Sequence, residues 1–435
     1  MTTLERRLGV GDAVVLGLGS MLGAGVFVVF APATAAAGGA GLLIALAIAG
    51  AVAFCNATSS ARLAARYPES GGTYVYGRER LGEFAGYLAG WGFVVGKTAS
   101  CAAMALTVGL YLAPAAARPV AIVVTVAVTA VNLVGVTKTA RVTRWLVAAT
   151  LAVLAVVVVV GVAARPVSPA VLTAPAVLTA AAVRPAGVLT AAGLLFFAFA
   201  GYARIATLGE EVRDPERTIP RAVPLALGIV LVVYAVVAVT ALAVLGAPQL
   251  AATPAPLAAV VQAAGVPGLA WLVRAGAVVA VVGVLLALLA GVARTTLAMA
   301  RRHDLPAALA AIHPTRRVPH RAQLLIGAVV VALVALADVR GAIGFSSVTV
   351  LVYYAIANAS ALTLPGRGRN AIAAAGLAGC VVLAASLPWR SVVAGIGVLA
   401  VGALWFVARR RFKIGTTSRK SLPPGPPETT TSRKL

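Results

Sequence analysis

The chain has 435 residues, of which 61% are hydrophobic and only 11% are charged, and its formal net charge is +24. A soluble domain carries about 25% charged residues, so this composition excludes a soluble globular protein and indicates a polytopic membrane protein. The first apolar run is too long for the core of a cleavable signal peptide and is interpreted as the first membrane span.

The cysteines and histidines give no sign of a metal or redox centre. Cys55, Cys101 and Cys380 all fall inside predicted membrane spans, where a thiol behaves as a small hydrophobic side chain. The three histidines share one predicted loop, at a spacing that does not suit a zinc site. We therefore expect no metal and no other cofactor.

The first predicted span, 12–36, contains the sequence Gly19-Ser20-Met21-Leu22-Gly23-Ala24-Gly25-Val26-Phe27. Each glycine in a helix interior is less favourable than alanine by about 1 kcal/mol. Within lipid, non-helical backbone survives only where it lines a cavity or is buried in protein. The segment is therefore interpreted either as an interrupted helix that binds a small polar solute or as a site of close helix packing.

Hydrophobic runs along the rest of the chain bring the expected number of spans to about twelve, because ~20 apolar residues cross the ~30 Å hydrocarbon layer. After 12–36, the spans are expected at Leu42–Ala65, Glu83–Ala113, Pro119–Val136, Thr143–Ala164, Val188–Glu210, Ile219–Leu245, Leu269–Ala300, Ala322–Ala337, Ala342–Leu364, Ala371–Leu387 and Ser391–Ala408.

Lysine and arginine gather in the segments on one side of these spans, and that side is expected to be cytoplasmic. Both termini then lie in the cytoplasm and the protein is an integral plasma-membrane protein. The other side holds only Arg118, Arg165, Arg184, Arg340 and Arg390. The basic excess faces the anionic lipid head groups of the cytoplasmic leaflet, and nucleic acid is not needed to explain the charge.

The sixth predicted span, 188–210, carries a second glycine near its middle. Gly201 follows the aromatic residues Phe196, Phe197 and Phe199, and Arg204 comes about one turn later. This span lies five spans after the first, so the two cross the membrane in opposite directions. Paired interrupted helices in two inverted halves indicate the central site of a secondary transporter.

Three motifs in register give the chain a family resemblance. They are the first-span sequence above, the loop Tyr67-Pro68-Glu69-Ser70-Gly71-Gly72-Thr73-Tyr74-Val75-Tyr76, and the sequence from Phe196 to Tyr202 with the following loop 210–222. From Leu8 to about Ala408, the chain resembles the amino acid–polyamine–organocation superfamily of secondary transporters.

This resemblance implies an all-α membrane fold with about twelve helices. Residues 12–164 would form a first five-helix repeat and residues 188–364 a second, inverted one, with two extra helices in 371–408. Residues 1–11 would be a cytoplasmic N-terminus. The tail 413–435, rich in proline, serine and threonine, is expected to be disordered.

The resemblance also implies a substrate site at the two interruptions. Backbone amides around Gly23, Ala24 and Gly25 would bind a substrate carboxylate, because the start of a half-helix is electropositive. Carbonyl groups of the aromatic segment before Gly201 would accept the α-amino group. The implied substrate-binding residues are Ser20, Met21, Gly23, Ala24, Gly25, Phe196, Phe197, Phe199 and Gly201.

Lys97 lies near the middle of the third span, and an ionisable group at that depth indicates function. No acidic residue lies in the core of any predicted span. A buried lysine can change its protonation state, so Lys97 is interpreted as a proton carrier, as a partner of the substrate carboxylate, or as a structural residue.

Other charged and polar positions are assigned to coupling or gating. Arg204 is expected to be buried, where it contacts either freed carbonyl groups or an anionic part of the substrate. Arg294 is expected to snorkel or to pair with Glu210 or Glu211 in a cytoplasmic gate. Thr150 occupies the place of the fifth-span lysine that family members use as a cation mimic, which argues against that coupling device here.

The sequence therefore predicts a secondary active amino acid transporter, proton-coupled or an exchanger. Its span cores hold basic residues and no acids, which favours a neutral or acidic amino acid as substrate. Two alternatives are a polyamine or cationic amino acid exchanger and a non-transporting amino acid sensor with the same fold. An enzyme is not expected, because the sequence offers no acid–base or metal constellation. Two broken helices within one chain also argue against a channel.

Overall fold

The computed structural model describes residues 8–67, 71–135, 140–164, 184–206 and 212–417. Within these ranges the fold is all-α and polytopic, as predicted. Eleven helices are long and apolar enough to cross a membrane, and one shorter apolar helix accompanies them. That helix, His320–Leu336, has 17 residues and stands where the ninth span is expected.

The first half of the chain begins with a span divided into short helices. Its helices are α1 (Val10–Met21), α2 (Ala24–Val28), α3 (Phe30–Ala37), α4 (Gly39–Arg66), α5 (Thr73–Leu81), α6 (Glu83–Leu112), α7 (Ala117–Val134) and α8 (Ala140–Ala164).

The second half also begins with a divided span. Its helices are α11 (Pro185–Phe199), α12 (Ala203–Ala206), α13 (Pro215–Ala252), α14 (Pro256–Ala263), α15 (Ala270–Arg301), α16 (His320–Leu336), α17 (Val339–Leu362), α18 (Arg367–Ala385) and α19 (Trp389–Thr417). Helix α13 changes direction at Gly246 (φ 70°, ψ 164°), one residue after the expected end of the seventh span.

Helix α6 lies in the interior of the bundle, where it packs mainly against α15 and α17. The two divided spans pack against each other, since α1 contacts α12 and α11 contacts α2 and α3, and the α2 part of the first span also contacts α6. By contrast, α18 and α19 expose large apolar side chains such as Val381 and Leu404. Exposed apolar faces on the outer helices are the surface that lipid covers. The bundle therefore places its two divided spans and α6 away from lipid.

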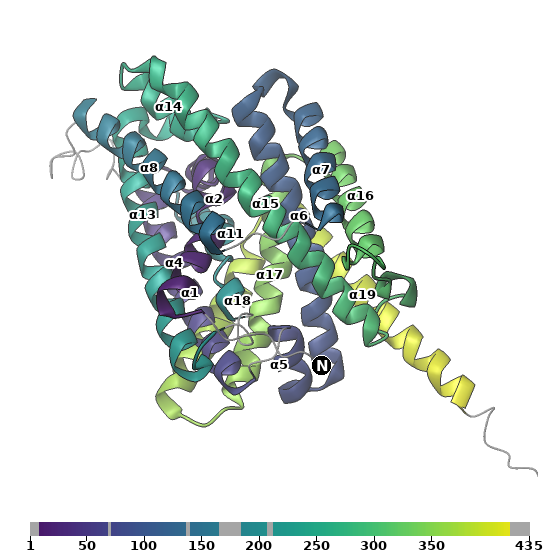
Figure 1. Cartoon of the computed structure of the whole chain (residues 1–435). Helices are drawn as coiled ribbons and strands as arrows, with labels where there is room; N and C mark the ends of the chain where they lie inside the picture. The colour runs from purple at the N-terminus through teal and green to yellow at the C-terminus, as the bar shows by residue number, and fades with distance from the viewer. Residues whose placement is uncertain (1–7, 68–70, 136–139, 165–183, 207–211, 418–435) are drawn as a thin grey trace, which may run out of the picture.

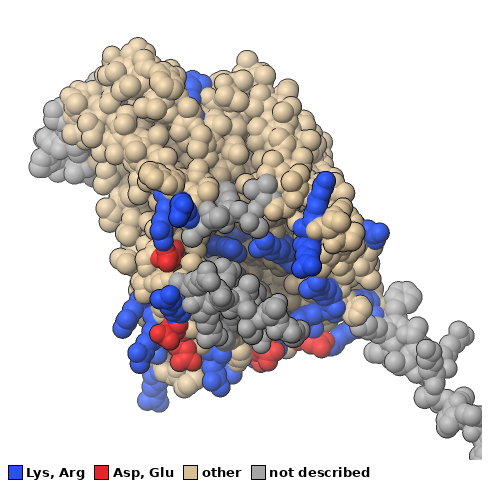
Figure 2. Space-filling model, viewed as in Figure 1, with Lys and Arg blue, Asp and Glu red and all other residues tan. Residues whose placement is uncertain are grey.

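The two ends of the bundle differ in charge. Helix α14 lies at one end and α5 at the other (Figure 1). The lysine and arginine side chains visible in Figure 2 gather over the half that carries α5, whereas the half that carries α14 is almost entirely tan on this face. We call the end with α5 the basic end and the other the α14 end.

Candidate functional site

The first span is interrupted where the sequence predicts. Helix α1 ends at Met21 and α2 begins at Ala24. Between them, Leu22 (φ −77°, ψ 60°) and Gly23 (φ −123°, ψ −139°) leave the helical region, and both are buried. The amide of Gly23 donates to the carbonyl of Met21, two residues back, at 2.8 Å. The regular hydrogen-bond ladder of the helix therefore stops here, inside the protein.

The sixth span is interrupted in the same way. Helix α11 ends at Phe199, and the four-residue helix α12 begins at Ala203. The three residues between them form a turn, in which the amide of Tyr202 lies 3.4 Å from the carbonyl oxygen of Phe199. Gly201 stands in the middle of this turn. We call the two interruptions the first break (22–23) and the second break (200–202).

The backbones of the two divided spans touch each other. A methyl group added at Gly201 would lie 2.6 Å from the carbonyl carbon of Ser20. One added at Gly25 would lie 2.6 Å from the Cα atom of Ala198. Real side-chain carbons do not approach a backbone so closely. The sequence of both spans therefore uses glycine because backbone meets backbone at these two positions.

Gly23 has a different neighbour. The three atoms closest to a methyl group added there all belong to the side chain of Val284 in α15, at 2.9–3.4 Å. A valine side chain can change rotamer, whereas a backbone contact cannot yield in this way. The side of the first break that faces α15 is therefore bounded by a side chain and not by backbone.

Tyrosine hydroxyl groups bind the carbonyl groups that the first break frees. The hydroxyl of Tyr234 in α13 lies 2.7 Å from the carbonyl oxygen of Met21 and 3.1 Å from that of Ala198. This hydroxyl thus bridges the two divided spans, and the two carbonyl oxygens share its single hydrogen atom. In the α2 part of the first span, the hydroxyl of Tyr111 donates to the carbonyl of Phe27 at 2.7 Å. These bonds replace the water that lipid cannot supply.

The side chain of Lys97 binds the backbone of the second break. The Nζ atom of Lys97 in α6 donates to the carbonyl of Ala200 at 3.1 Å, and this side chain is only 7% exposed. The hydroxyl of Tyr354 in α17 donates to the same carbonyl at 3.3 Å. The Tyr354 ring in turn packs against Phe196 and Tyr202, with centroids 5.7 and 5.0 Å away. The second break is therefore held by one charged and one neutral donor.

The remaining predicted binding residues lie around these breaks. The Ser20 hydroxyl bonds to the carbonyl of Leu16 in its own helix, at 2.8 Å. Met21, Ala24 and Gly25 are buried, and α2 begins without a side-chain cap on its first amides. The aromatic residues of α11 are also buried; these are Phe196, Phe197 and Phe199. The structure thus brings the predicted binding residues together around the two breaks.

The predicted gating residues do not form one cluster. Arg204 is exposed rather than buried, and the expectation of a buried guanidinium is wrong. Arg204 follows the second break and lies in the short helix α12. Its side chain is exposed there and does not point into the bundle interior. Arg294 of α15 is exposed as well, and Thr150 is buried with its hydroxyl bonded to Leu146 in its own helix, at 2.8 Å. Both acids expected to pair with Arg294 lie outside the described residues; they are Glu210 and Glu211.

The two tyrosines at the breaks, Tyr234 and Tyr354, belong to none of the three sequence motifs. Each hydroxyl needs a partner when it is buried in a membrane helix. A lone tyrosine in an otherwise apolar span, such as Tyr234, is therefore the signal that points to a freed carbonyl nearby.

A buried acid joins three segments at the basic end. The Asp304 carboxylate, 0% exposed, accepts from the Tyr74 hydroxyl and from Arg78 of α5, both at 2.6 Å, and pairs with Arg409 of α19 at 2.8 Å. Burial and the bond to Asp304 raise the pKa of the Tyr74 hydroxyl, which therefore stays protonated as a donor. The indole of Trp405 donates to the Asp304 carbonyl at 3.1 Å. At the basic end of the bundle, this cluster fixes α19 to α5 and to the segment that follows α15.

Comparison with known proteins gives a consistent result over almost the whole chain. A family model described as amino acid permease matches residues 12–408. An uncharacterized transporter of Mycobacterium tuberculosis is 63% identical over 410 residues, which are 94% of this chain and 92% of that protein. The branched-chain amino acid permease of Bacillus subtilis is 26% identical over 382 residues, 82% of this chain and 80% of that protein.

The name of a plant relative gives a different class of substrate. The chloroplastic cationic amino acid transporter 7 of Arabidopsis thaliana is 27% identical over 387 residues, which are 82% of this chain and 65% of that protein.

Proposed function

The chain belongs to the amino acid permease family, and on that premise we propose that it moves a neutral or acidic amino acid across the plasma membrane by alternating access. Membership makes it an integral membrane transporter and not an enzyme. Secondary active transport, by proton coupling or by exchange, is the form we propose. The two five-helix segments, 12–164 and 188–364, would act as inverted repeats around the breaks.

The contact between the two breaks is the observation that carries this proposal. At one place it offers uncapped amides at the start of α2, carbonyl groups of α11, and the Lys97 ammonium. A zwitterion needs donors and acceptors a few ångströms apart, and broken helices supply both without a fixed negative charge. The yielding side chain of Val284 beside Gly23 supplies the place where the solute would enter the site.

The charges around the breaks support the choice of substrate. In its protonated form, Lys97 places a positive charge on the second break. Among the described residues, no aspartate or glutamate lies in the interior of a membrane-crossing helix. A cationic amino acid or a polyamine would therefore bring a second positive charge beside Lys97 without a compensating acid. A carboxylate-bearing solute would instead be attracted.

Lys97 is also our candidate for coupling transport to protons. Its amine can release a proton when buried, whereas an arginine stays charged. Loss of that proton would weaken the bond to the Ala200 carbonyl, because a neutral amine is a poorer donor than an ammonium, and would loosen the hold of α6 on the second break. The protonation state of one side chain would thus be linked to the position of the divided span.

We propose that the basic end faces the cytoplasm, with both chain termini on that side, because Lys and Arg accumulate in cytoplasmic segments. Arginines of α5 and α19 such as Arg80 and Arg410 lie at this end. Anionic lipid head groups of the inner leaflet would attract them by about 1 kcal/mol per residue near the surface.

Counterflow in proteoliposomes tests the proposed function. The purified full-length protein is reconstituted with an unlabelled amino acid inside, and entry of the same labelled amino acid is followed for a panel of neutral, acidic and basic substrates. We expect saturable accumulation of one or more neutral or acidic amino acids. Accumulation of arginine or putrescine alone would refute the substrate class. Binding without accumulation would instead identify a sensor.

The cationic alternative has one observation in its favour. The plant relative that is 27% identical is named a cationic amino acid transporter. The same panel separates the two hypotheses, because a cationic substrate would have to compete with the Lys97 ammonium for acceptors at the second break.

A further inference from the structure

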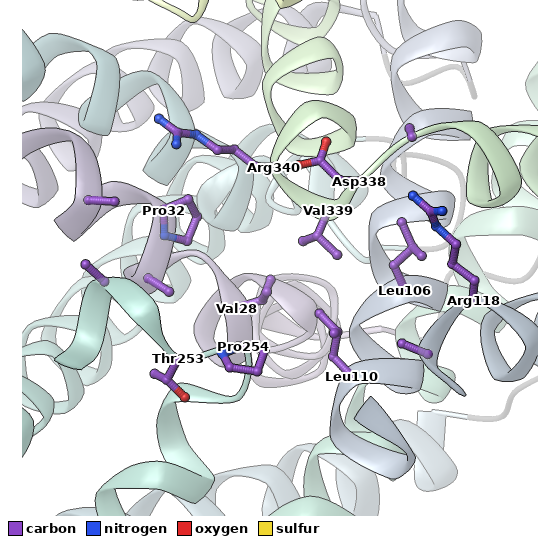
Figure 3. Close-up of a pocket in the computed structure, with 15 residues that line it drawn as sticks. Val28, Pro32, Leu106, Leu110, Arg118, Thr253, Pro254, Asp338, Val339 and Arg340 are labelled. Carbon is purple, nitrogen blue, oxygen red and sulfur yellow. The ribbon is translucent and has the colours of Figure 1, made fainter. Parts of the chain in front are cut away.

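A pocket opens at the α14 end of the bundle, beyond the first break. It has a volume of about 390 Å³, and its walls are mainly apolar (Figure 3). Val28 comes from the end of α2, Leu106 and Leu110 come from the outer part of α6, and Val339 begins α17. A volume in this range accommodates a small organic solute.

Two arginines border this pocket. In the view of Figure 3, Arg118 of α7 and Arg340 of α17 lie on opposite sides, and Asp338 lies between them. All three side chains are exposed. Neither arginine forms an ion pair within the described part of the chain. Asp338, the only acid among the lining residues, accepts from the amide of Gly341 at 3.0 Å and caps α17.

The charge of Asp338 is therefore partly neutralised by the start of the helix that it caps. Together with Arg118 and Arg340, it leaves the mouth of the pocket positive. Other arginines at the α14 end are engaged elsewhere: Arg184 donates to the carbonyl of Ala35 at 3.0 Å, and Arg390 lies 5.6 Å from the centre of the Trp389 ring. Arg118 and Arg340 are the two arginines that line the pocket itself.

The pocket adjoins the helix that carries the first break. Val28 in its wall is the last residue of α2, and Gly23 precedes the first residue of the same short helix. The Tyr111 hydroxyl holds the neighbouring Phe27 carbonyl at 2.7 Å, and Arg274 donates to the Tyr111 carbonyl at 3.0 Å. A solute in the pocket is therefore one short helix away from the candidate substrate site.

We propose that this pocket is a separate outer binding site for small carboxylates, in which Arg118 and Arg340 attract the carboxylate and the apolar wall contacts the hydrocarbon part. The inference rests on the proposed function, since it gives the transporter an outer station for its own substrate class. A positive pocket with low-dielectric walls raises the local concentration of anions and their rate of arrival. It disfavours cationic solutes for the same reason.

A test of the pocket's field that is independent of transport uses thiol reagents. Val339→Cys places a thiol in the pocket wall, in a background where the half-buried Cys55 is replaced by serine. The rates of modification by an anionic and by a cationic methanethiosulfonate are compared on the full-length protein. We expect the anionic reagent to be favoured by about 10-fold at low salt, with the preference falling as ionic strength rises.

The double variant Arg118→Gln/Arg340→Gln should bring this ratio close to one. Arg390→Gln removes the same charge at the same end without touching the pocket, and it should leave the ratio unchanged. Equal ratios in the parent protein and the double variant would overturn the proposal. So would an equal effect of Arg390→Gln.

Uptake kinetics then connect the pocket to transport. For a substrate with a net negative charge, such as L-glutamate, the double variant should raise the KM for entry from the α14 side by about 5-fold, with Vmax within about twofold. Efflux from the basic end should keep its KM. If no amino acid is carried by the unmodified protein, the proposed function fails, while the reagent ratios still decide whether the pocket attracts anions.

Discussion

The two breaks use the same backbone device but differ in what holds them. At the first break, the carbonyl of Met21 is bound by the neutral hydroxyl of Tyr234. At the second, the carbonyl of Ala200 is bound by the Lys97 ammonium and shared with the Tyr354 hydroxyl. The donor at the first break, Tyr234, comes from α13, whereas Lys97 comes from the interior helix α6.

Interruption and charge are therefore separate features of the site. The first break is electrically neutral apart from its uncapped amides, so it offers donors to a carboxylate. The second break already carries a cation on its freed carbonyl, so its geometry depends on the state of that cation. We therefore expect changes at the second break to alter coupling, and changes at the first to alter the site without altering its dependence on protons.

The largest effect is expected from a methyl group inserted into the contact between the two divided spans. Gly201→Ala forces a methyl group against the Ser20 carbonyl carbon, 2.6 Å away in the present packing. A displacement of about 1 Å in a site costs about 100-fold in rate, and we expect a loss of that order in counterflow. Gly228→Ala is the matched control, because a methyl group there meets open space in α13. Size-exclusion profiles of both variants verify folding, and full activity of Gly201→Ala would show that the contact is irrelevant.

The next effect separates the two breaks directly. Lys97→Met removes the cation of the second break and leaves Tyr354 as the described donor to the Ala200 carbonyl. Uptake driven by a pH gradient should be abolished, while expression stays near normal, because methionine fills the space of the lysine stem. Uptake driven by a substrate gradient measures the effect that remains without protons. Full pH-driven uptake would assign Lys97 to a structural role.

A smaller effect is expected from the hydroxyl groups. Tyr234→Phe leaves the carbonyls of Met21 and Ala198 without their hydroxyl donor, at a cost of about 1–3 kcal/mol in the free energy of unfolding. Tyr354→Phe should cost less, because Lys97 still donates to Ala200. Thermal unfolding of the two purified variants gives the comparison. An equal loss in both would mean that the charged donor at the second break adds nothing.

The smallest effect is the coupling between donors at one break. Lys97 and Tyr354 share the Ala200 carbonyl, so the double variant Lys97→Met/Tyr354→Phe should be non-additive by about 0.5–1 kcal/mol. Lys97→Met combined with Tyr234→Phe should be closer to additive, because the two side chains bind different carbonyls. A double-mutant cycle on thermal stability measures both. Equal coupling in the two cycles would contradict the independence of the breaks.

The positions of the breaks could be predicted from sequence because glycine is a local signal. Gly23 and Gly201 interrupt long apolar runs, and the structure interrupts the helices at both. The membrane-crossing helices follow the same logic, since their length and composition are local properties. The family relationship, inferred from three motifs, is confirmed by the match over residues 12–408.

The partners of the breaks could not be predicted, because they depend on how distant helices are placed. Tyr234 reaches Met21 across more than two hundred residues of sequence. Arg204 was expected to be buried because it lies within the sixth apolar span, 188–210, but helix α12 places it at an exposed position. The Asp304 cluster is also a long-range feature, since it joins Tyr74 and Arg409.

A cryo-electron microscopy structure of the full-length protein in nanodiscs, with the amino acid identified by counterflow, tests the central claim most directly. We expect solute density beside the first break, with its carboxylate at the amides of Gly23 to Gly25 and its remaining atoms between Val284 and the second break. Continuous helices through Gly23 and Gly201, or solute bound away from both breaks, would contradict the proposed transport site.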